Sequence, residues 1–224
     1  MATEEKQLTE KESLDLIAMM INKAKNAYYE TGVSAIMWGT LIAICSLERL
    51  AELQFGYQLP FDIFLLTLIA VIPQVIISMR ENKQRKVRTY DEEYIDTVWV
   101  AFGICIFLMI VVVNVIFNAW EPLASDYEKL GGHPNPARFN EYVSALFLLL
   151  YGLPTFITGA ACKFKPMLWG GIICWISCIV TLFTPIKIDL LLTAASAIMA
   201  WLIPGIIIKK EHREYKKAQA VANV

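Results

Sequence analysis

Six long apolar stretches constrain this chain more than any other feature of its sequence. Each is close to the roughly 20 residues that an α-helix needs to cross a bilayer. Apolar residues make up 57% of the 224 residues, more than is usual for a soluble protein. The sequence therefore predicts an all-α integral membrane protein with a single membrane domain over residues 33–208. Its six transmembrane helices are expected near residues 33–53, 60–79, 97–118, 141–161, 166–185 and 187–208.

The basic residues fall on one side of these spans. If both termini are in the cytoplasm, all but four of the 20 lysines and arginines lie on the cytoplasmic side; the exceptions are Arg49, Lys129, Arg138 and Lys187. Short loops with an excess of basic residues stay in the cytoplasm. We therefore expect an even number of spans, both termini inside, and a basic cytoplasmic tail over residues 209–224. The formal net charge of −1 does not indicate a nucleic-acid partner.

The absence of certain sequence motifs indicates the cellular location of the protein and whether it holds a cofactor. The first apolar run is not preceded by a cleavable signal peptide, and the short loops contain no N-x-S/T acceptor. A bacterial plasma (inner) membrane is therefore the expected location. The five cysteines form no CxxC pair, so neither a disulfide framework nor a metal site is indicated. No cofactor is expected.

The six spans form three hairpins in which the same residue types recur. A tryptophan begins the first helix of each hairpin and a proline lies in its second helix. The pairs are Trp38 and Pro73, Trp99 and Pro154, and Trp169 and Pro204. The separation is the same in the first and last hairpins, and a longer outer loop, 119–140, lengthens the middle one. The pattern indicates three parallel two-helix repeats, although Trp at interfaces and Pro within spans are also ordinary in membrane proteins.

The three prolines are also candidate helix-break positions. A proline inside a helix leaves the carbonyl one turn earlier without its hydrogen bond and can kink the helix. Kinked or broken helices line internal binding sites in many transporters. Pro73, Pro154 and Pro204 are therefore expected to interrupt their spans.

Residues 1–32 are expected to form a cytoplasmic amphipathic helix ahead of the first span. Thr9 and Glu12 have the spacing of a capping box, and apolar residues recur at helical intervals as far as Tyr28. The polar face lacks the heavy basic charge that is typical of a membrane-surface helix. This helix could cover the cytoplasmic side of the protein or bind a cytoplasmic protein partner through residues 9–28.

A set of charged residues is expected at the outer ends of the spans. Glu48 and Glu52 lie one turn apart on the same helix face, beside Arg49. Three more acids lie near the outer starts of the returning helices: Asp62, Glu141 and Asp189. Together these six residues are a candidate outer polar cluster. Charges near the interface cost little free energy, because the side chains can reach water. Anchoring and pairing within the protein are therefore an alternative to a binding site.

No pattern in the sequence predicts an enzyme. It contains no nucleophile elbow, no histidine pair and no phosphate-binding glycine loop, and no catalytic residue is assigned. Two function classes are left. One is a non-catalytic membrane protein that senses, scaffolds or binds a partner, in addition to its contact with the lipid bilayer. The other is a small transporter or channel with an acidic outer vestibule through which cations enter.

Overall fold

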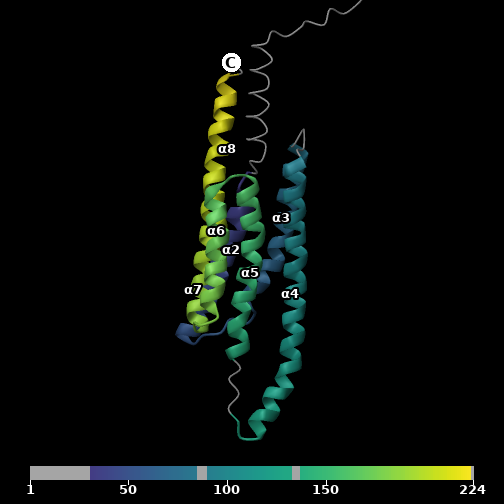
Figure 1. The fold of residues 1–224 in the computed structure, drawn as a ribbon, viewed down its shortest axis with the longest axis vertical. Helices are drawn as coiled ribbons and strands as arrows, with labels where there is room; N and C mark the ends of the chain where they lie inside the picture. Colours follow the sequence, from purple (N-terminus) through teal and green to yellow (C-terminus); the bar gives the residue numbers. More distant parts are fainter. Residues whose placement is uncertain (1–30, 85–89, 133–136, 223–224) are drawn as a thin grey trace, which may run out of the picture.

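The computed structural model describes residues 31–84, 90–132 and 137–222, and this part of the chain contains helices and no strand (Figure 1). The predicted N-terminal helix, with its candidate partner-binding residues 9–28, lies outside these ranges. The elements in chain order are α2 (Val33–Phe55), the 3-10 helix η1 (Ile63–Leu65), α3 (Leu66–Gln84), α4 (Tyr90–Lys129), α5 (Ala137–Ala161), α6 (Lys165–Thr181), α7 (Ile186–Ala197), the π-helical turn η2 (Ile198–Leu202) and α8 (Ile203–Ala222).

The prediction of an all-helical chain is confirmed for the described residues. Five helices are long and apolar enough to cross a membrane, and α6 is a shorter apolar helix of 17 residues. α6 ends at Thr181, before the predicted residue 185, and Pro185 is the N-cap residue of α7. α4 runs to Lys129, well into the predicted loop 119–140, and ends before Gly131, which has a φ of 82°.

A bundle of α2, α5, α6 and the continuous α7–η2–α8 unit forms the core of the molecule. α5 packs along α6, while α2 packs against α7, η2 and α8. The residues that fill the centre of the bundle include Leu148, Cys174, Ala197 and Trp201. α2 begins and α8 ends at one end of the bundle, called the terminal end below. At the opposite end, called the turn end, α2 finishes at Phe55 and α7 begins at Ile186.

Glycines allow the backbones of this bundle to approach closely. A Cβ atom on Gly170 of α6 would lie 2.5 Å from the Cα atom of Ala200, and one on Gly39 of α2 would lie 2.5 Å from the backbone nitrogen of Leu202. Both distances are far below a normal carbon contact. Such close approach of two backbones gains van der Waals contact along the helices. η2 is therefore held between α2 and α6.

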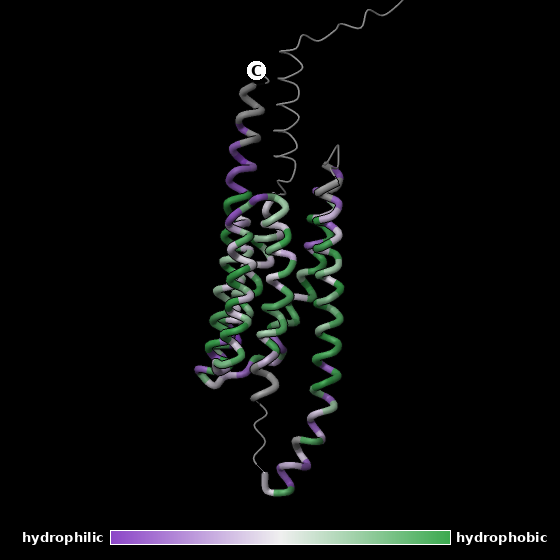
Figure 2. Tube along the Cα trace, in the orientation of Figure 1, coloured by the Kyte–Doolittle hydropathy of each residue, from purple (hydrophilic) through white to green (hydrophobic). Residues whose placement is uncertain are grey.

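α3 and α4 lie outside this bundle. Within the described residues, the backbone of α3 approaches only α2 and η1, and that of α4 approaches only α5. Most of their apolar side chains are exposed. Figure 2 shows hydrophobic colouring over much of α3 and along the middle of α4. These two helices therefore present most of their apolar surface outward.

Tryptophan side chains connect the two outer helices to the bundle. The indole nitrogen of Trp38 on α2 donates to the side-chain oxygen of Gln74 on α3 at 3.0 Å. The indole nitrogen of Trp99 on α4 donates to the Thr158 hydroxyl on α5 at 3.1 Å. The Trp99 ring also packs edge-on against Trp201 of η2. An indole N–H away from water needs such an acceptor, so each outer helix has a defined register.

The three candidate helix-break prolines have different surroundings. Pro73 lies within α3 and Pro154 within α5, and both helices continue past the proline. Pro204 directly follows the π-helical turn η2. A proline ring collides with the carbonyl four residues earlier in a regular α-helix, and a wider π-turn is one way to relieve that collision.

We predict that Gly170→Val destabilises the protein in detergent by about 1–3 kcal/mol, because the added side chain must displace the backbone at Ala200. The matched control is Gly103→Ala on α4, where an added Cβ would meet no atom within 4 Å. That variant should be neutral, or more stable by up to about 1 kcal/mol because alanine favours the helix. Thermal unfolding of both purified variants tests this, and equal melting temperatures would contradict the packing described.

Candidate functional site: the polar turn end of the bundle

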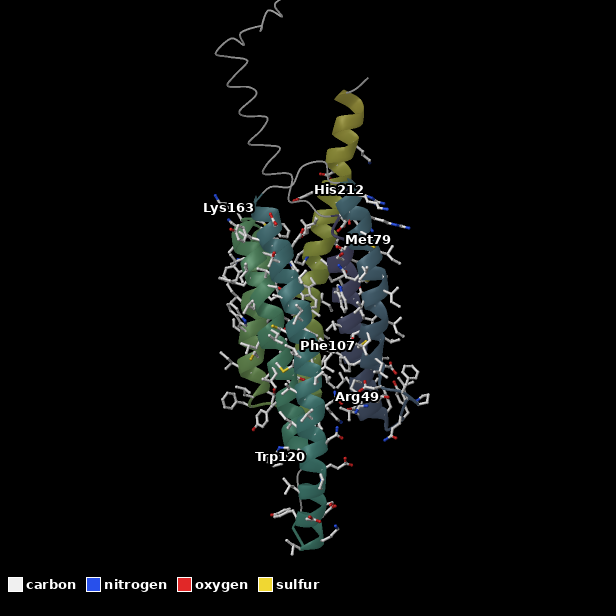
Figure 3. All side chains as sticks on the ribbon, turned by 90° about the vertical axis from the view of Figure 1, so that its right-hand side faces the viewer. Arg49, Met79, Phe107, Trp120, Lys163 and His212 are labelled. Atoms are coloured by element: carbon white, nitrogen blue, oxygen red, sulfur yellow. The ribbon has the colours of Figure 1, made fainter. Side chains whose placement is uncertain are left out.

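Three members of the predicted outer cluster lie together at the turn end of α2. Arg49 donates to a carboxylate oxygen of Glu52 at 2.6 Å, and Glu52 is buried, with 7% of its surface exposed. The other Glu52 oxygen accepts the backbone N–H of Leu59 at 2.9 Å. Glu48 accepts the hydroxyl of Tyr57 at 2.5 Å. The two glutamates therefore hold residues 56–62 against the end of α2. Figure 3 shows Arg49 in this region.

The contact with Glu48 changes the titration of Tyr57, which lies in the connection between α2 and η1. The pKa of Tyr57 is raised from 10 to about 12, mainly because its hydroxyl donates to the Glu48 carboxylate, with partial desolvation and the negative charge of Glu48 adding to the effect. A raised pKa means that the neutral phenol is favoured in the folded state. The interaction therefore stabilises the fold below about pH 10 and is lost as the pH rises through about 12.

Asp62 and Glu141 lie near the starts of other helices. Asp62 is exposed and accepts the backbone N–H of Phe64 at 2.9 Å, as an N-terminal cap of η1. An aspartate at this position satisfies one of the free N–H groups of a helix start. Glu141 is the fifth residue of α5. The structure does not describe its side chain.

Asp189 differs from the other acids because it is completely buried. It lies in the first turn of α7, and its exposed fraction is 0%. Its Oδ1 atom is 2.5 Å from the hydroxyl oxygen of Thr184, which also lies 3.1 Å from the backbone carbonyl of Val180. A hydroxyl has a single hydrogen and two lone pairs. A Thr184 hydroxyl that donates to Asp189 fits either an ionised or a neutral carboxyl group; if Thr184 donates to Val180, a protonated Asp189 donates to Thr184.

Buried hydroxyl groups continue from Asp189 into the bundle. On α7, the buried residues Thr193 and Ser196 follow Asp189 at helical spacing. On α6, the buried residues Ser177 and Thr181 lie one helical turn apart. The hydroxyls of Ser196 and Ser177 are joined by a hydrogen bond of 3.0 Å. These residues extend over about two helical turns, or about 10 Å, and the Thr193 and Thr181 hydroxyls donate to carbonyls of their own helices, at Asp189 and Cys178. We call Asp189, Thr193, Ser196, Ser177 and Thr181 the polar seam.

Ser46 of α2 faces the same region. It is fully buried, and its hydroxyl forms no hydrogen bond with the described residues. It lies about two turns beyond Gly39, on the same face of α2, and Gly39 packs on Leu202. Because α2 and α7–η2 run antiparallel, Ser46 lies at the level of Ser196.

The polar side chains described above at the turn end offer mainly carboxylate and hydroxyl oxygen atoms. Among the described residues, no group of three or more His, Cys, Asp or Glu side chains could hold a metal ion. Carboxylate and hydroxyl oxygens can bind or pass a proton, or accept hydrogen bonds. The sequence identified Asp189 by its place at a helix start. It did not identify the seam, because serines and threonines scattered through apolar spans carry no signal until the facing helix is known.

We predict that Glu48→Gln lowers the pKa of Tyr57 from about 12 toward 10, because the carboxylate that holds its proton is removed. The measurement is an ultraviolet difference titration of the protein against its Tyr57→Phe variant, which isolates this tyrosine from the others. Asp126→Asn is the control, since Asp126 pairs with Lys129 on an exposed part of α4. An unchanged Tyr57 titration in Glu48→Gln would contradict the contact.

The arrangement at the turn end is therefore defined by the chain's own residues. Glu48, Glu52 and Asp62 each accept a hydrogen bond from a neighbouring residue, and Asp189 shares one with Thr184. Comparison with protein-family models, with curated proteins and with solved structures finds no match for this chain.

Proposed function

We propose that this is a non-catalytic, multi-pass protein of a plasma membrane that acts by binding another transmembrane helix along the exposed side of α4. The observation that carries the proposal is Asn114. This residue is exposed within the apolar run of α4, and within the described ranges its amide donates to the carbonyl of Ile110 on its own helix, at 2.8 Å, and to no other residue. A polar side chain in lipid is stabilised by hydrogen bonds to a neighbouring helix.

Asn114 lies on a stripe suited to helix packing. Gly103, Phe107 and Val111 precede it at helical spacing, and all four residues are exposed. An added Cβ on Gly103 would meet no atom within 4 Å, so another backbone has room to approach there. Small residues that allow such approach, together with a polar side chain, are the features that associate helices in membranes. Figure 3 shows Phe107 on α4.

The distribution of charge supports an orientation with the terminal end in the cytoplasm. Exposed cations at that end come from α3, the α5–α6 connection and α8: Arg80, Lys83, Lys163, Lys165, Lys209, Lys210, Arg213 and Lys217. At the turn end the described cations are Arg49, Lys129 and Lys187. The excess of basic residues favours the cytoplasmic side. The same proposal includes six membrane spans, a location in a bacterial inner membrane, and a cytoplasmic partner that binds residues 9–28.

The hairpin repeat is also part of the proposal. In the first two hairpins the tryptophan of the first helix donates to the second helix close to its proline: Trp38 to Gln74, and Trp99 to Thr158. This similarity supports duplication of those two hairpins. In the third hairpin Trp169 is 60% exposed.

A photo-reactive amino acid at Phe107 tests the proposed helix partner. In membranes of the source cell, it should form a discrete adduct with a protein, either a second copy or another membrane protein. The matched control places the same amino acid at Ile106, which faces the core; it should give no adduct with another chain. Asn114→Leu should reduce the Phe107 adduct severalfold. Reaction with lipid alone would contradict the proposal.

Proton-linked transport is a second candidate, favoured by one observation: the fully buried Asp189 at the mouth of the polar seam. Its hydrogen bond with Thr184 suits both protonation states, as described above. The charged groups nearby are the Arg49–Glu52 pair on α2 and Lys187, which donates to Gln54. Against this candidate, Glu48, Glu52 and Asp62 hold local structure and do not line an open vestibule.

Proteoliposomes that contain a pH-sensitive dye separate the two candidates. For the helix-binding protein, we expect proton flux to equal that of empty liposomes. For a transporter, flux should exceed the background and fall at least tenfold in Asp189→Asn, which keeps the shape of the side chain but cannot exchange a proton. Asp126→Asn, on the exposed part of α4, should leave any such flux unchanged.

A further inference from the structure

The outer surface of α3 has a shallow depression near the terminal end. It is lined by Ile76, Met79, Arg80 and Lys83. These residues recur at intervals of three and four, so they lie on one face of the helix. Figure 3 shows Met79 on the outward side of α3, away from the bundle. Two apolar and two basic side chains thus share one patch at the end of a candidate membrane span that finishes at Glu81.

The positive charges of Arg80 and Lys83 in this patch are free to bind an anion. Arg80 and Lys83 are exposed, and neither forms a hydrogen bond or ion pair with another described residue. The nearest acid in the sequence, Glu81, accepts the hydroxyl of Thr31 at 2.5 Å and is therefore directed toward the start of α2. Among the residues that the structure describes, the patch consequently carries positive charge without a neutralising carboxylate on the same face.

An apolar stripe continues from the patch toward the turn end. Ile69 and Ile72 extend the line from Ile76, and all three side chains are largely exposed. The distance from Ile69 to Met79 is about 15 Å along the helix. That is half of the roughly 30 Å hydrocarbon core of a bilayer. The patch thus combines a basic region at interface depth with an apolar surface as long as one acyl chain.

We propose that this face of α3 is a binding site for an anionic phospholipid, with the phosphate of the headgroup held by Arg80 and Lys83 and an acyl chain lying along Ile76, Ile72 and Ile69. Arg and Lys at this depth attract lipids with a net negative charge. A zwitterionic lipid has the same phosphate but no net charge and binds more weakly. The inference rests on the proposed insertion of α3 into a membrane.

The test counts lipids bound to the purified full-length protein by native mass spectrometry, with phosphatidylglycerol and phosphatidylcholine of identical acyl chains. Each basic residue near an anionic surface is worth roughly fivefold in affinity. The double variant Arg80→Gln/Lys83→Gln should therefore weaken binding of the first phosphatidylglycerol by roughly 25-fold. Its effect on phosphatidylcholine should be less than threefold.

The matched control is Lys163→Gln/Lys165→Gln. It removes the same charge from the terminal end but from the α5–α6 connection, which lies across the molecule from Met79 in Figure 3. This variant should change the first phosphatidylglycerol affinity by less than threefold. Equal losses in the two double variants would overturn the site in favour of general charge attraction. Loss of inorganic phosphate binding in Arg80→Gln/Lys83→Gln, with unchanged affinity for phosphatidylglycerol, would overturn the lipid as ligand.

A separate measurement distinguishes failure of this inference from failure of the proposed function. The protein and both double variants are expressed and their membranes are washed with alkaline carbonate. Retention in the membrane together with equal affinity for the two lipids would overturn only the lipid site. Release of the wild-type protein by the wash would overturn the membrane proposal itself, and the lipid site with it.

Discussion

The structure depends on the close approach of α2 and α6 to the α7–η2–α8 unit. Gly39 and Gly170 bring two backbones against η2, at Leu202 and Ala200. These short backbone distances and the interhelical hydrogen bonds hold the helices together through van der Waals and directed polar contacts. The Trp201 indole, which donates to the Thr155 hydroxyl at 2.8 Å, adds α5 to the same centre. The bundle is therefore assembled around a single irregular turn.

α3 and α4 lie at the edge of the bundle, and most of their apolar surface faces outward, although Trp99, Phe102 and Ile106 of α4 pack against the core. α3 packs on α2 and η1, α4 packs on α5, and a tryptophan hydrogen bond fixes the register of each. Their outer faces differ in chemistry. α4 carries a glycine and an asparagine in an apolar stripe, which suits another helix, whereas α3 ends in unpaired basic residues, which suit an anionic headgroup. The two proposals thus assign different partners to two surfaces that the same packing leaves exposed.

The acids at the turn end show how similar sequence positions acquire different roles. Glu52 and Asp62 both accept backbone N–H groups and shape the connection after α2. Asp189 lies in the first turn of α7 and is completely buried. A charge that is removed from water is costly unless it is paired or protonated. This is why Asp189, and not the exposed acids, carries the alternative proposal of proton-linked transport.

The sequence by itself determined the helices and their approximate ends, because apolar run length, proline and glycine act locally. It also located Asp62 and Asp189 at helix starts for the same reason. It could not determine that α2, α5, α6 and α7–α8 form the core while α3 and α4 lie outside. All six stretches are apolar on every side, so periodicity does not distinguish a protein-facing side from a lipid-facing one. Only the tertiary structure decided that Ser177 meets Ser196, that Asp189 is buried, and that Asn114 and Arg80 face outward, since these depend on which helix lies opposite.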